Sequence, residues 1–159
     1  MKLRLSVVCA LMLAGCVTSQ PKQTQAELQN DVFEIFFTTL IGSNGSANMS
    51  RQSAIALCFP KHSDPDPEFL KRFSNQSTPI VPCSAGARGP APAYEAILRT
   101  SGAPAIQLSI DAVYFSSDSE VAIEGGYYEA SLSGAGWRFE LEKKHGKWVI
   151  VKHYMMGVS

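Results

Sequence analysis

The sequence has few charged residues, and its positive and negative charges balance. Charged side chains make up 18% of the 159 residues, with 14 lysines and arginines against 14 aspartates and glutamates. Both signs are scattered along the chain. Proteins that bind nucleic acid usually carry a basic patch or stripe. The composition therefore argues against nucleic acid as a partner.

Long apolar runs, internal repeats and cysteine motifs are also missing. Crossing a bilayer takes about 20 apolar residues, and the longest apolar run, residues 5–13, is shorter than this. The four cysteines form no CxxC pair and no cluster with histidine. Metal or redox centres of the common types are therefore not indicated, and we expect neither a metal nor a cofactor.

The amino terminus has the pattern of a secretory signal. Lys2 and Arg4 precede the apolar run, which is followed by the small residues Ala14 and Gly15. A basic region, a short apolar region and a small-residue cleavage point form a signal peptide. We expect residues 1–15 to be removed, which leaves a chain close to the commonest single-domain size of about 100–150 residues.

The residues around the cleavage point resemble the lipobox of bacterial lipoproteins. The stretch Leu13-Ala14-Gly15-Cys16 carries this resemblance, which implies cleavage before Cys16 and a lipid on its thiol. An ordinary signal peptide or a free buried cysteine are the alternatives. Residues 16–23 are short and polar, as in a flexible tether. Position 17 is Val and not Asp, and by the sorting habit of such lipoproteins this points to the outer membrane, facing the periplasm.

The two remaining cysteines, Cys58 and Cys83, are predicted to form a disulfide. Thiols in an oxidising envelope compartment usually pair. A catalytic or metal-binding role is the alternative. The stretch from His62 to Asp66 could supply nitrogen and oxygen ligands to a metal, but Asp64 or Asp66 followed by proline is better explained as a helix cap.

We expect a single domain over residues 24–159. The sequence of its first half predicts helices and short extended segments. Thr24 and Glu27 have the spacing of a capping box, and apolar residues recur at helical spacing up to Gly42. The apolar run 54–59 could form a strand or a buried helix, and a strand is favoured. A second short helix is expected after Asp64 or Asp66. Residues 79–83 contain two prolines and are expected at a sheet edge at best, followed by a loop over 84–93.

The second half predicts an antiparallel meander, because apolar and polar residues alternate from Tyr94 onward. Gly125–Gly126 is expected to be a bulge that brings Tyr128, Ala130 and Leu132 onto the apolar face. The turns are expected at 100–102, 116–119, 133–136 and 143–147. The residues expected to share the apolar face of the longest strand are Ile106, Leu108, Ile110, Ala112 and Tyr114.

These expectations describe an α+β fold with helices packed on a curved antiparallel sheet. The order of elements and the closing Phe139-x-Leu141…Gly146-Lys147-Trp148-x-Ile150 resemble the NTF2-like (cystatin-like cone) superfamily. That resemblance implies a concave sheet that encloses a pocket. Its members include enzymes, binding proteins and immunity proteins, so the fold leaves the function open.

Two functions are consistent with these expectations. The favoured one is a non-catalytic, lipid-anchored envelope protein that binds a protein or an apolar ligand, for example an immunity-type lipoprotein. The alternative resembles a ketosteroid isomerase and needs a carboxylate and a hydrogen-bonding acid in one pocket. Asp111, Tyr114 and His153 are the candidate pocket residues, together with Tyr127 and Tyr128. Asp111 and Tyr114 would lie on opposite faces of a regular strand.

Overall fold

The computed structural model describes residues 23–43 and 51–158 and shows a mixed α+β fold. The predicted signal peptide and Cys16 lie outside the described residues. In chain order the elements are α1 (Gln25–Ser43), β1 (Ala54–Cys58), η1 (Pro60–His62), α3 (Pro67–Lys71), β2 (Ile80–Pro82), η2 (Cys83–Ala85), β3 (Gly86–Arg88), β4 (Ala96–Leu98), β5 (Ala105–Ser117), β6 (Glu120–Ala130), β7 (Ser133–Lys144) and β8 (Lys147–Val158).

Helix α1 begins at the predicted capping box. The backbone N–H of Thr24 donates to Glu27 Oε2 at 2.8 Å, and the N–H of Glu27 donates to Thr24 Oγ1 at 3.2 Å. These bonds satisfy two amides that have no partner within the helix. The buried side chains of α1 are Leu28, Val32, Phe33, Phe36, Phe37 and Leu40.

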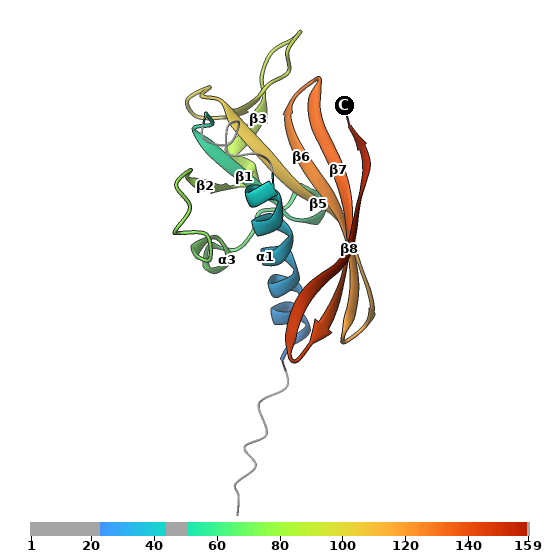
Figure 1. Cartoon of the computed structure of the whole chain (residues 1–159). Coiled ribbons are helices and arrows are strands. Elements are labelled where there is room, and N and C mark those ends of the chain that lie inside the picture. The colour runs from blue at the N-terminus through green and yellow to red at the C-terminus, as the bar shows by residue number, and fades with distance from the viewer. Residues whose placement is uncertain (1–22, 44–50, 159) are drawn as a thin grey trace, which may run out of the picture.

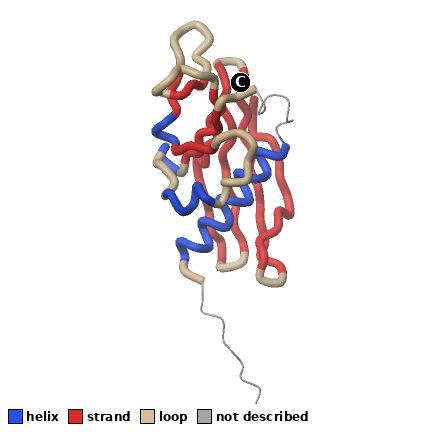
Figure 2. Tube along the Cα trace, turned by 90° about the vertical axis from the view of Figure 1, so that its left-hand side faces the viewer, coloured by secondary structure: helices blue, strands red, loops and turns tan. Residues whose placement is uncertain are grey.

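A six-stranded sheet in the order β2-β1-β5-β6-β7-β8 curves around α1 (Figures 1 and 2). Strands β5 to β8 form the predicted antiparallel meander. Strand β1 runs parallel to both β2 and β5. Neither helix among the described residues has the length and apolar character that a membrane crossing requires.

The sheet has an inner face, against α1, and an outer face on the opposite side. On the inner face the ring of Phe36 meets that of Phe139 edge-on, with centroids 5.3 Å apart. The pair β3–β4 lies beside the outer face of β1, where a Cβ on Gly86 would be 3.4 Å from Ala56 Cβ. The outer face of β6 to β8 extends beyond this cover (Figure 1).

The bulge lies in β5 and not at Gly125–Gly126, so that prediction is wrong. Ile110 pairs with Gly125 and Ala112 with Glu124, which leaves Asp111 as the extra residue. The extra residue changes the phase of the strand. Beyond it, Val113 and Phe115 pack on the core and Tyr114 is 53% exposed. Tyr114 therefore does not share the apolar face of Ile106, Leu108 and Ile110.

The two glycines of β6 allow close approach and do not re-phase the strand. Its pairing with β7 runs unbroken through Gly125 and Gly126. A Cβ on Gly125 would lie 2.1 Å from the carbonyl oxygen of Ser109 and 2.8 Å from Phe36 Cζ. Tyr127, rather than the predicted set that began at Tyr128, packs against the core.

Two predicted loops are strands. Residues 133–136 begin β7, and the preceding turn lies at 131–132. Gly86–Arg88, expected in a loop, pair with β4 in a separate small sheet. The hairpin between β7 and β8 turns as predicted, because His145 and Gly146 adopt positive φ angles of 51° and 79°, which the tight turns of two-residue hairpins require.

Candidate binding surface

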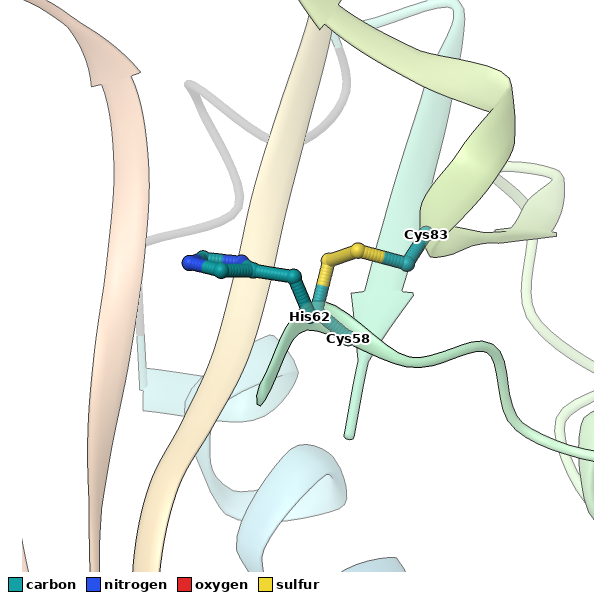
Figure 3. Close-up of side chains that lie close together, drawn as sticks. All are labelled: Cys58, His62 and Cys83. Carbon is teal, nitrogen blue, oxygen red and sulfur yellow. A yellow bond between two sulfur atoms is a disulfide. The ribbon is translucent and has the colours of Figure 1, made fainter. Parts of the chain in front are cut away.

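The disulfide between Cys58 and Cys83 fastens the end of β1 to the start of η2 (Figure 3). Both cysteines are buried, and their Cα atoms are 4.6 Å apart. Asp64 reinforces the same connection, because its carboxylate accepts hydrogen bonds from the N–H and the hydroxyl of Ser84, each 2.7 Å long. These contacts assign the region a structural role.

The same region contains the residues considered for a metal. One ring nitrogen of His62 and the two cysteine sulfurs lie within 4.8 Å of one another. The sulfurs are bonded to each other, so this form offers no thiolate ligands, and the imidazole points away from the S–S bond (Figure 3). Asp66 caps α3 by accepting from the N–H of Phe69 at 2.8 Å, as the capping interpretation predicts.

The three candidate pocket residues lie in three different surroundings. Asp111 is the bulge residue of β5 and is exposed. Tyr114 lies on the outer face, where the guanidinium of Arg138 is 5.6 Å from its ring centroid. His153 pairs with Phe139, and their rings stack with centroids 5.8 Å apart. Because Phe139 faces α1, His153 belongs to the inner face and does not approach Tyr114.

Tyr114 forms one wall of a hollow on the outer face, with a volume of about 340 Å³. The floor is the small side chain of Ala122, which lies between Tyr114 and Glu140 in the sheet register. The opposite wall includes Val151, one of two bulge residues of β8. The hollow therefore has an aromatic wall on one side, an aliphatic wall on the other, and the small side chain of Ala122 between them.

Charged groups border this hollow. Arg138 donates to Glu124 Oε1 at 2.5 Å, and this hydrogen bond raises the pKa of the guanidinium. At the edge of the sheet, Lys152 Nζ lies 3.8 Å from Glu140 Oε1. Arg138 is held by its carboxylate partner beside the ring of Tyr114, an arrangement suited to contact with polar and aromatic groups of a partner.

A second hollow of about 430 Å³ lies further along the same face. Its floor is a row of residues that pair across four strands, in the order Ser109, Gly126, Gly136 and Gly157. Glycines leave the backbone accessible from this side, and Asp111 lies at the rim. The outer face is therefore indented at two places along β5 to β8.

Exposed large apolar side chains gather on β8. Met155 is 56% exposed, and the neighbouring strands contribute few such residues. Contiguous exposed apolar patches mark surfaces that meet another molecule. Tyr154 pairs with Arg138 on the outer face, whereas Met155 pairs with Trp137 and lies on the inner side. The exposed apolar residues of β8 are Val149, Val151, Tyr154, Met155, Met156 and Val158.

In a regular strand Asp111 and Tyr114 would lie on opposite faces, and the outer surface was not predicted from the sequence. The signal was present in the sequence. The set Ile106, Leu108 and Ile110 is out of phase with Val113 and Phe115, and the polar residue Asp111 lies where the phase changes. A change of phase within one strand is the mark of a bulge.

Comparison of the chain with protein-family models, curated proteins and solved structures finds no match.

Proposed function

We propose that this chain is a bacterial lipoprotein of the outer membrane, facing the periplasm, whose domain binds another protein through the outer face of β5 to β8. The observation that carries the binding function is the pair of hollows on this face, beside the exposed apolar side chains of Val151, Tyr154 and Met156. This surface combines apolar area with bordering charges, as protein interfaces do.

The position of Gln23, the first described residue, fits an anchored domain. Gln23, at the end of the tether, accepts a hydrogen bond of 3.0 Å from Lys143 Nζ beside the β7–β8 hairpin. Strand β8 runs from this hairpin to the far end of the molecule (Figure 1). A lipid on Cys16 would therefore hold the hairpin end toward the membrane and leave the outer face accessible in the periplasm.

We also propose that the domain is NTF2-like. A helix on the concave side of a four-stranded meander supports this assignment, as does the closing hairpin that leads into Trp148. Between α1 and the sheet the described side chains include several phenylalanines. A binding function on the outer face does not depend on an enclosed pocket.

The arrangement of the candidate acid and base groups favours binding over isomerase-like catalysis. A shared site needs a carboxylate and an acid within hydrogen-bond reach of one substrate. Asp111 and Tyr114 border different hollows, and His153 stacks on the inner face. The ketosteroid-isomerase-like alternative therefore gains no support from these positions.

Replacement of Cys16 by serine is expected to abolish lipid attachment, because serine lacks the sulfur that forms the thioether. The measurement is incorporation of radiolabelled palmitate, together with the amount of protein in the outer-membrane fraction. Cys9→Ser is the matched control, since Cys9 lies in the predicted signal peptide and its replacement should leave both readouts unchanged. Palmitate in the Cys16→Ser protein would contradict the anchor.

A further inference from the structure

The two edges of the sheet are built differently. The edge strand β2 has three residues and ends in Pro82, and such short edges with proline resist pairing with another strand. The other edge, β8, has 12 residues and no proline. Among the described residues no strand pairs with its free side. Proteins usually blunt a long edge with features such as bulges, and β8 has bulge residues at Val151 and Met156. Between them, residues 152–155 keep a regular register with β7 and leave a free edge that requires an explanation.

The charges of β8 are all of one sign or neutral. The strand contains Lys147, Lys152 and His153 and has no aspartate or glutamate. The side chain of Lys152 is 62% exposed, and its distance to the Glu140 carboxylate is 3.8 Å, at the outer limit for an ion pair. Lys152 can therefore receive a second carboxylate from outside the molecule.

We propose that an extended segment of a partner protein, carrying carboxylate and apolar side chains, adds to β8 as a further strand. Main-chain hydrogen bonds along the free edge would supply affinity, and alternate side chains would supply selectivity. Carboxylates on the outer side of the added strand would lie beside Lys152, and apolar residues on its inner side would meet Met155, which pairs with Trp137. This inference rests on the proposed function and specifies how the partner is recognised.

A second copy of this chain fits the edge less well. Antiparallel pairing of two β8 strands would direct their hairpin ends, and so their tethers, to opposite ends of the dimer. With β8 perpendicular to the membrane, one of the two tethers would have to span the strand length of about 40 Å, whereas a tether over 16–23 reaches at most about 28 Å. Parallel pairing would keep the tethers together but would place Lys152 beside its own copy, which costs free energy.

The test uses full-length protein in detergent and two fluorescent ten-residue peptides, one of alternating Glu and Val and one of alternating Lys and Val. The acidic peptide is expected to bind at least tenfold more tightly than the basic one, and its affinity should fall as the salt concentration is raised. Its binding should also protect the amides of β8 from hydrogen exchange. Equal binding of the two peptides, or protection confined to other strands, would overturn the proposal.

Charge reversal gives the matched comparison. Lys152→Glu is expected to weaken binding of the acidic peptide and to strengthen binding of the basic peptide. Lys71→Glu, on the exposed surface of α3, should change neither affinity. Thermal melting checks that both variants are folded. Self-association that protects β8 without peptide would overturn the proposal in favour of a second copy. A partner crosslinked through Tyr114, with β8 unprotected by either peptide, would overturn strand addition and leave the proposed function intact.

Discussion

Replacement of Gly125 by alanine is expected to prevent the domain from folding stably. The added Cβ would lie 2.1 Å from the carbonyl oxygen of Ser109 and 2.8 Å from Phe36 Cζ. The first atom belongs to the backbone of β5 and the second to a ring packed between α1 and the sheet, so neither can move aside cheaply. We expect a loss of about 3 kcal/mol or more, a large part of the roughly 5–15 kcal/mol that stabilises a domain.

The comparison variant is Gly136→Ala in the next strand. A Cβ at Gly136 would meet its nearest neighbours, Met156 Cε and Gly125 O, at 3.8 and 3.9 Å, which are ordinary contacts. Its melting temperature should stay within a few degrees of the parent's. A Gly125→Ala variant that melts like Gly136→Ala would contradict the close approach of Gly125 to Ser109 and Phe36.

Replacement of Trp148 by alanine is the second change with a large expected effect. Trp148 is 7% exposed and belongs to the core cluster, with its ring centroid 6.4 Å from that of Phe115. Lys143 Nζ lies 5.7 Å from the same ring. Truncation of a buried aromatic residue typically costs about 3–5 kcal/mol. We therefore expect a strongly lowered melting temperature or poor accumulation of the protein.

Val149→Ala is the control for this variant, because Val149 follows directly in β8 and is 37% exposed. Chemical denaturation of both variants should show a much lower midpoint for Trp148→Ala alone. Unchanged stability of Trp148→Ala would contradict the inward orientation of the first half of β8 and would indicate that the indole belongs to the binding surface.

The features that sequence analysis predicted correctly depend on a few neighbouring residues. The capping box needs only Thr24 and Glu27, and the last hairpin needs a turn that accepts positive φ at His145 and Gly146. The meander followed from apolar alternation joined by short turns. Each of these signals is local, so the folded context did not override it.

The features that were missed depend on residues far apart in the chain. The parallel alignment of β1 with β5 joins residues far apart in sequence, such as Ala54 and Ala105, and β3 forms only because β4 lies beside it. The glycine pair was interpreted as a bulge because its close neighbours, Phe36 and Ser109, are distant in sequence. The outer surface was missed for the related reason that face assignment depends on the bulge at Asp111.

The most direct test of the proposed function is photocrosslinking in the bacterial envelope. A benzophenone amino acid would replace Tyr114, an exposed aromatic residue on the wall of the first hollow, in the full-length protein. A control variant of the same protein would carry the benzophenone amino acid in place of Lys71, at an exposed position on α3. We predict one discrete protein adduct from position 114 and none from position 71. Absence of an adduct at position 114, or the same adducts from both positions, would contradict a binding function for the outer face.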